Sequence, residues 1–112
     1  MAFQVNLEIT NGIAKFALAG ELDASTAVQF KEVIEKAAAE NPRRLALLMN
    51  DLEFMASAGL RVLIFAKQKM GPAVDIYVVG AQEAVKDTLQ KTGFHHSVIL
   101  LDAYDAEEIE AI

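Results

Sequence analysis

The sequence contains no cysteine, so it can form neither a disulfide framework nor a thiolate metal site. It also lacks any run near the roughly 18 to 20 apolar residues that a membrane-spanning helix requires. The N-terminal stretch MAFQVNLEIT has none of the basic and hydrophobic regions of a signal peptide. His95 and His96 are adjacent, a spacing that points their side chains apart and suits zinc poorly. We therefore expect a cytoplasmic protein with no metal, no cofactor and no membrane partner.

Positive charge is also scarce. The chain has 10 lysines and arginines against 16 aspartates and glutamates, which gives a net charge of −6. Nucleic acid is therefore not an expected direct partner. Five of the acids lie in a C-terminal tail with no basic residue among them, and we expect them to form a solvated helix face: Asp102, Asp105, Glu107, Glu108 and Glu110.

The first twenty residues predict a β-hairpin. Apolar residues alternate with polar ones in FQVNLEIT, and Asn11-Gly12 separates this run from IAKFALAG. Asn-Gly between two alternating runs favours a two-residue type I′ turn. That turn sets Thr10 opposite Ile13, and on the other face of the strands it sets Glu8 opposite Lys15.

Helical and strand patterns alternate after the hairpin. Asp23 or Ser25 is the expected cap of a helix that ends at Asn41-Pro42. The remaining elements are a buried strand at 44–49, a helix at 57–70, a strand at 74–79, a helix at 82–92, a strand at 97–101 and a terminal helix capped by Asp102. Residues 1–112 thus predict one small α/β domain with a mixed, mostly parallel sheet, an N-terminal hairpin and about four helices.

Ser57, in EFMASAGLR, is the most informative single residue. MASAG resembles the G-x-S-x-G turn of serine hydrolases, and His95 lies downstream. Against catalysis, Met55 replaces the first glycine, and no glycine-rich segment precedes Ser57 to supply a second oxyanion donor. The chain is also short for a hydrolase sheet. We therefore do not expect an enzyme.

A structural role for Ser57 is the simpler alternative. Serine is a preferred N-cap, because its hydroxyl accepts a hydrogen bond from an N–H group in the first turn. Capping does not explain the small residues around it, Ala56, Ala58 and Gly59, which we expect to be exposed. Small neighbours would leave the hydroxyl open to a large visiting active site.

Two segments resemble the STAS domain, in particular the stand-alone bacterial anti-sigma factor antagonists. NDLEFMASAGLRVL is similar to the family wording D-L-S-x-M-D-S-S-G-L-G-V-L, and LAGELDASTA is similar to its G-E-L-D stretch. The later VVGAQEAVKDTLQKTGF resembles the last helix of the family. The resemblance covers nearly the whole chain.

The resemblance implies a phosphorylation site at Ser57. In that family an anti-sigma serine kinase phosphorylates this serine, the unphosphorylated antagonist binds the kinase and frees a sigma factor, and a PP2C-type phosphatase resets the cycle. Here Ala56 replaces the usual aspartate, and Ala58 replaces a second hydroxyl residue. The expected partner-binding residues are Gly20, Glu21, Leu22, Asp23, Ser25, Ala56, Ala58, Gly59 and Arg61. The alternative is a STAS-like interaction or ligand-sensing module that acts on a non-sigma partner.

Overall fold

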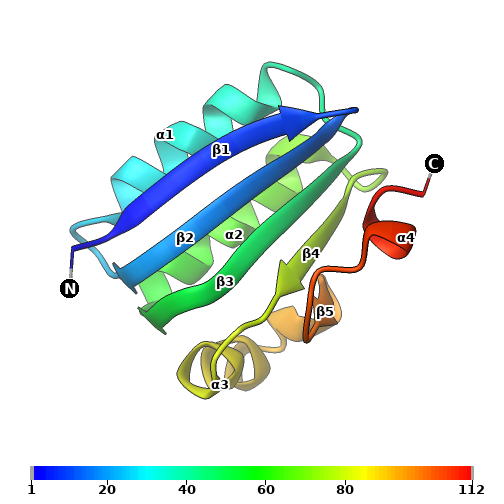
Figure 1. The fold of residues 1–112 in the computed structure, drawn as a ribbon. Helices are drawn as coiled ribbons and strands as arrows, with labels where there is room; N and C mark the ends of the chain where they lie inside the picture. The colour runs from blue at the N-terminus through cyan, green and yellow to red at the C-terminus, as the bar shows by residue number, and fades with distance from the viewer. Residues whose placement is uncertain (1, 112) are drawn as a thin grey trace.

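The computed structural model describes residues 2–111 as a five-stranded sheet with helices on both faces (Figure 1). The strand order is the chain order, β1-β2-β3-β4-β5. The elements are β1 (Gln4–Thr10), β2 (Ile13–Leu22), α1 (Ala27–Ala38), β3 (Arg44–Met55), α2 (Ser57–Met70), β4 (Asp75–Val79), α3 (Glu83–Thr92), the 3-10 helix η1 (Phe94–His96), β5 (Ile99–Leu101) and α4 (Ala106–Ile109). The predicted fold class is confirmed.

The predicted hairpin is confirmed in its turn and its register. Asn11 and Gly12 have φ values of 54° and 80°, which suit a type I′ turn. Thr10 pairs with Ile13, and Glu8 pairs with Lys15. The strands β2 to β5 then run parallel to one another, so the hairpin supplies the only antiparallel pair among the described strands.

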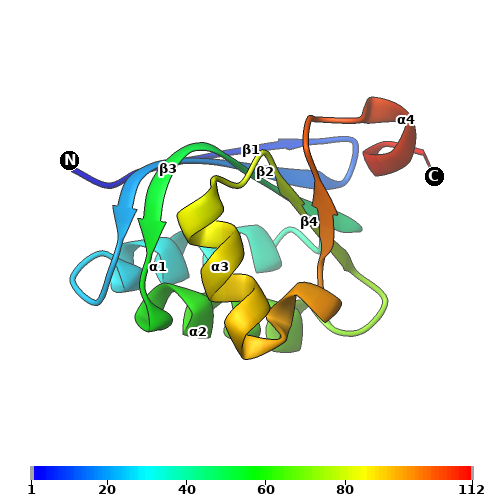
Figure 2. The same ribbon diagram turned by 90° about the horizontal axis from the view of Figure 1, so that it is seen from below.

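The three longer helices share one face of the sheet. Each crossover from β2 to β5 moves the same way along the sheet, and right-handed crossovers in one direction place their helices on one side. Figure 2 shows α1, α2 and α3 together on that side. The main core lies between, where Phe16, Phe30, Ile34, Leu47 and Leu63 are fully buried. Phe30 contacts both Phe3 and Phe16 edge-on.

The other face of the sheet is partly covered by residues 102–111, which we call the C-terminal cover. Its buried residue Ile109 lies in a second apolar cluster with Ile13, Ala46, Tyr77 and Val79. The helix α4 is capped by Asp105, whose carboxylate accepts a hydrogen bond from the Glu108 N–H at 3.2 Å. The prediction that Asp102 caps this helix is therefore wrong.

Polar contacts also hold the C-terminal cover in place. The Arg44 guanidinium donates to the carbonyl oxygens of Glu108 and Ile109 at 2.8 and 2.9 Å. Glu110 accepts a hydrogen bond from the Tyr104 hydroxyl at 2.5 Å, and it lies 3.5 Å from the Lys15 ammonium. Four of the five tail acids are exposed as expected, but Glu110 is paired against the sheet.

Several boundaries differ by a few residues from the sequence-based prediction, and two of these differences concern β3 and α1. β3 runs six residues beyond Met49, to Met55, because its second half continues to pair with β2 through an irregular register. α1 begins at Ala27 with Thr26 at the N-cap position, after a turn that starts at Asp23. No helix within the described range is long and apolar enough to span a membrane.

Candidate functional site

The candidate site lies where β2 and β3 end side by side. The carboxyl ends of parallel strands meet at one edge of a sheet, and here Leu22 pairs with Met55 as the last residue of each strand. The Ala56 N–H then donates to the Leu22 carbonyl at 2.8 Å, which ties together the two segments that leave the sheet. Asp23 and Ser57 are the next residues along these segments, so both lie at this edge.

Ser57 is the first residue of α2, and it is exposed. The N-cap position belongs to Ala56, whose backbone is extended (φ −82°, ψ 171°) and whose carbonyl accepts from the N–H groups of Gly59 and Leu60. The alternative in which Ser57 is the N-cap is therefore wrong. Its hydroxyl is not required to begin the helix, and it stands at the positive end of the helix dipole.

Gly59 is buried rather than exposed, which corrects the expectation for this residue. A Cβ atom on Gly59 would lie 2.7 Å from both Cγ and Cδ2 of Leu22 and 3.0 Å from Cγ of Met55. Leu22 and Met55 are themselves almost fully buried. The missing side chain thus lets the first turn of α2 pack directly on the ends of β2 and β3, and this packing sets the position of Ser57.

We expect Gly59→Ala to lower the free energy of unfolding by roughly 1 kcal/mol. Overpacking typically costs about 1–3 kcal/mol, and better helix propensity returns up to about 1 kcal/mol. In a Leu22→Ala background the two nearest atoms are gone and only Met55 Cγ remains at 3.0 Å, so the same substitution should cost clearly less or be neutral. Urea unfolding of the four proteins in this double-mutant cycle gives the result. The same loss in both backgrounds would refute the packing explanation.

Asp23 organises the turn before α1. Its Oδ1 atom accepts from the Ser25 hydroxyl at 2.7 Å, from the Ser25 N–H at 3.0 Å and from the Thr26 N–H at 3.2 Å. In return, the Asp23 N–H donates to the Thr26 hydroxyl oxygen at 2.9 Å. The hydrogen bond from the Ser25 hydroxyl is the main cause that lowers the pKa of the Asp23 carboxyl below 3.8, with smaller contributions from the two backbone N–H groups.

We expect Ser25→Ala to raise the pKa of Asp23, because the substitution removes the hydrogen bond that lowers this pKa most. A carboxyl group whose pKa is lowered by folding stabilises the folded state at pH values above its pKa in the unfolded chain. This stabilisation is lost as the pH falls through the pKa in the folded state. The decrease in the free energy of unfolding below about pH 3.8 should therefore be smaller in the variant than in the parent. NMR titration of the Asp23 carboxyl carbon measures the shift directly. An unchanged pKa would mean that the Ser25 hydroxyl does not hold the carboxylate.

The nine expected partner-binding residues divide by burial. Glu21, Ser25 and Arg61 are exposed with Ser57, and Asp23, Ala56 and Ala58 are half-buried. Gly20 and Leu22 are buried like Gly59, so these three cannot present side chains to a partner. A Cβ atom on Gly20, at φ +88°, would collide with the Ala2 carbonyl. Their part is to shape the edge beneath the exposed residues.

Two residues at this edge were missed by the sequence reasoning. Phe54 pairs with Glu21 across the strands, and its side chain is 46% exposed. Continuing the strand pattern to Met55 would have placed Phe54 on the opposite face from that buried residue. Thr88 of α3 donates its hydroxyl to the Met55 carbonyl at 3.2 Å and so braces the end of β3. No local sequence pattern marks that contact.

Ser57 is exposed and lies outside the three hollows described for this structure. Three surface hollows, of about 240, 280 and 370 Å³, are lined by residues of other regions and do not include Ser57. His95 lies in η1 after α3, and its buried Nδ1 atom makes no hydrogen bond within residues 2–111, so this atom is not a partner for the Ser57 hydroxyl. Within residues 2–111 no three potential metal ligands cluster. An exposed hydroxyl outside these hollows suits contact with another protein.

Comparison with known protein families matches the STAS domain over residues 4–108. The chain belongs to the STAS domain family. A curated relative, the anti-sigma-F factor antagonist RsfB of Mycobacterium tuberculosis, is 31% identical over 83 residues, which cover 74% of this chain and 68% of RsfB. The family predicted from the two motifs is thus confirmed.

Solved structures share the fold of this STAS chain. A crystal structure of an anti-sigma factor antagonist from Mycobacterium paratuberculosis aligns with a TM-score of 0.88 at 23% identity, over 97% of this chain and 95% of that one. The phosphorylated form of the Bacillus cell fate determinant SpoIIAA aligns with a TM-score of 0.70 at 20% identity, over 97% of both chains. At these identities the likeness concerns the fold alone.

Proposed function

We propose that this STAS domain is an anti-sigma factor antagonist that is switched by phosphorylation of Ser57. The unphosphorylated protein binds an anti-sigma serine kinase in the cytoplasm and so frees a sigma factor. The kinase releases itself by transferring the γ-phosphoryl group of ATP to the Ser57 hydroxyl, and a PP2C-type phosphatase restores the free hydroxyl. The observation that carries this proposal is the exposed Ser57 at the start of α2, a helix whose N-cap is already formed by Ala56.

The fold tolerates a phosphate at this position. A phosphoserine adds about −1.5 to −2 charges, and the N-terminus of a helix favours an anion by roughly 0.3–1 kcal/mol at an exposed site. Arg61 is exposed one turn further along α2, on the same side of the helix as Ser57. A cation at that spacing adds to the local attraction.

Partner binding, unlike the stability of the fold, would be weakened by a phosphate on Ser57. A partner that fits the neutral hydroxyl and the small side chains of Ala56 and Ala58 would have to desolvate a bulky dianion. Glu21 and Asp23 also lie at this edge and add like charge on the antagonist's own surface. Phosphorylation would therefore act by making the surface unfit for binding, without refolding the domain.

The relatives support this proposal. RsfB carries the name of an anti-sigma-F factor antagonist, and SpoIIAA is solved in phosphorylated and unphosphorylated forms. The chain keeps Ser57 in the matching motif but has Ala56 before it and Ala58 after it. Ser57 is therefore the single hydroxyl of that run, and its partner must recognise a neutral residue at position 56.

We expect one phosphate per chain when the protein is incubated with ATP and its cognate anti-sigma kinase, and none in Ser57→Ala. Ser97→Ala is the matched control, because Ser97 is an exposed serine after η1, outside the expected partner-binding residues, and its replacement should leave the yield unchanged. Intact-mass spectrometry measures the phosphate. A phosphate that persists in Ser57→Ala would move the site elsewhere. If the kinase neither binds nor phosphorylates the parent, a STAS-like module with a non-sigma partner becomes the better explanation.

A further inference from the structure

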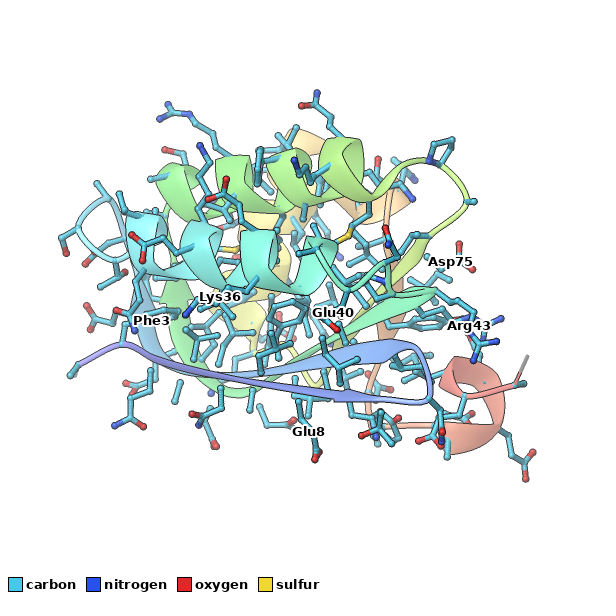
Figure 3. All side chains as sticks on the ribbon, turned by 90° about the horizontal axis from the view of Figure 1, so that it is seen from above. Phe3, Glu8, Lys36, Glu40, Arg43 and Asp75 are labelled. Carbon is cyan, nitrogen blue, oxygen red and sulfur yellow. The ribbon has the colours of Figure 1, made fainter. Side chains whose placement is uncertain are left out.

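The strand β1 presents an outer edge that no described strand covers. Natural proteins protect such edges with lysine, proline or a β-bulge, because an open edge can pair with another strand. The sequence of β1, QVNLEIT, contains neither lysine nor proline and only one charged residue, Glu8, and its seven residues pair with β2 in a register without shifts. Figure 3 looks onto this edge, with α1 above it and Glu8 directed to the open face of the sheet.

The turn determines which backbone groups of β1 are free. In a two-residue type I′ hairpin the residues that flank the turn, Thr10 and Ile13, exchange hydrogen bonds. Bonded pairs recur at every second residue, so the other residues of β1 direct their N–H and C=O groups away from β2. These residues are Val5, Leu7 and Ile9, which also bear the apolar side chains of the strand.

Their side chains remain incompletely covered. Val5 and Leu7 are half-buried and Ile9 is 37% exposed, although all three lie on the face of the sheet that the helices pack against. The edge therefore offers free backbone groups and apolar surface on the same three residues. A strand added there would use both.

We propose that this edge binds the β1 strand of a second copy of the chain, antiparallel, with a two-fold axis at Leu7. Leu7 then faces Leu7 of the second copy and Val5 faces Ile9, so all outward-directed residues form hydrogen-bonded pairs. On the open face Asn6 lies opposite Glu8 of the second copy. The sheet becomes a continuous ten-stranded sheet across the two copies, built from the five strands of each.

Charge and the length of the paired segment favour this register over the other antiparallel registers that match the free backbone groups. An axis at Glu8 would set the two Glu8 carboxylates directly against each other, which is destabilising. An axis at Asn6 would pair only residues 4–8 and leave Ile9 without a partner in the strand. The axis at Leu7 uses all of β1 and sets no like charges across the strands.

The neighbouring helix agrees with this arrangement. Figure 3 shows Lys36 toward the Phe3 end of the edge and Glu40 toward the Arg43 end. A two-fold axis at Leu7 exchanges these ends, so it brings Lys36 of each copy to the side of Glu40 of the other. Both side chains are exposed, and the approach of opposite charges favours a second copy as the occupant.

The absence of cysteine allows a direct test by disulfide formation. Leu7→Cys places two thiols across the axis, where Cα atoms in a bonded antiparallel pair are about 5.5 Å apart and within the range of a disulfide. Gln4→Cys is the control, because its copies lie about 20 Å apart along the strand direction. We expect mild oxidation to cross-link Leu7→Cys into covalent dimers and to leave Gln4→Cys unlinked. Equal linking of both, or of neither, would overturn the proposal.

A charge introduced at Asn6 provides a second test that leaves the core untouched, because Asn6 is exposed. Asn6→Lys creates two attractive pairs with Glu8 across the axis, and Asn6→Glu creates two repulsive ones. We expect the dimer dissociation constant, measured by sedimentation equilibrium, to fall in the first variant and rise in the second by roughly two- to thirtyfold. A chain that stays monomeric at high concentration, or a dimer that ignores both variants, would overturn the proposal. This inference does not depend on the role of Ser57.

Discussion

Replacing Ser57 with aspartate should weaken binding to the anti-sigma kinase by about thirtyfold or more. A carboxylate that becomes buried at an interface without a partner costs roughly 2 kcal/mol, and 1.4 kcal/mol corresponds to a factor of ten. The fold should not suffer, because the first residue of a helix tolerates an acid and gains about 0.3–1 kcal/mol from it. Calorimetric titration and urea unfolding on the same variant separate the two effects.

Two further variants act as controls for this result. Ser57→Ala keeps the surface neutral and, with Ala56 as the N-cap, should change stability by no more than about 0.5 kcal/mol. It should bind the kinase as the parent does. Gln68→Asp adds the same charge to an exposed position of α2 outside its first turns and should also bind normally. If Gln68→Asp weakens binding as much as Ser57→Asp, net charge rather than the site would be responsible.

Ile109→Ala should lower the free energy of unfolding by about 2 kcal/mol, the lower end of the usual cost of truncating a buried isoleucine. We expect the lower end because Ile109 lies in the smaller apolar cluster, apart from the main core. Ile109 is fully buried among Ile13, Tyr77 and Val79, on the face opposite the longer helices. Glu107→Ala, an exposed change in the same helix, should have little effect and is the matched control.

Tyrosine titration reports whether the C-terminal cover has loosened. The chain has two tyrosines and no tryptophan, and both tyrosines lie in this cluster. Burial is the main cause that raises the pKa of Tyr77 and of Tyr104 above 10.0. In Ile109→Ala both values should move down toward 10.0, as measured by tyrosinate absorbance. An unchanged titration together with unchanged stability would show that Ile109 does not anchor the segment.

Local patterns predicted the elements of the fold well. The Asn-Gly turn fixed the register of the hairpin, since alternating residues on both faces agreed with one pairing. The helix from Ser57 to Met70 has the predicted ends, because Gly71 follows it and breaks the helical pattern. The helix before Gly93 also ends as expected, with that glycine in the left-handed conformation at φ 76°.

Tertiary packing decided what the sequence could not predict. Gly59 appeared exposed among small residues, but it is buried because α2 lies directly on Leu22 and Met55. The N-cap of α2 is Ala56, which has no capping side chain, although the N-cap preference of serine favoured Ser57. Asp105 rather than Asp102 caps α4 for a similar reason, because docking of Ile109 sets where that helix begins. Such outcomes depend on contacts between distant parts of the chain.

We expect the state of the Ser57 hydroxyl, free or phosphorylated, to control partner binding. The most direct test of this claim is calorimetric titration of the anti-sigma kinase with the unmodified protein and with protein carrying a single phosphate on Ser57. We predict that the unmodified form binds the kinase and that the phosphorylated form binds it at least thirtyfold more weakly. Equal affinity of the two forms for the kinase would contradict the claim.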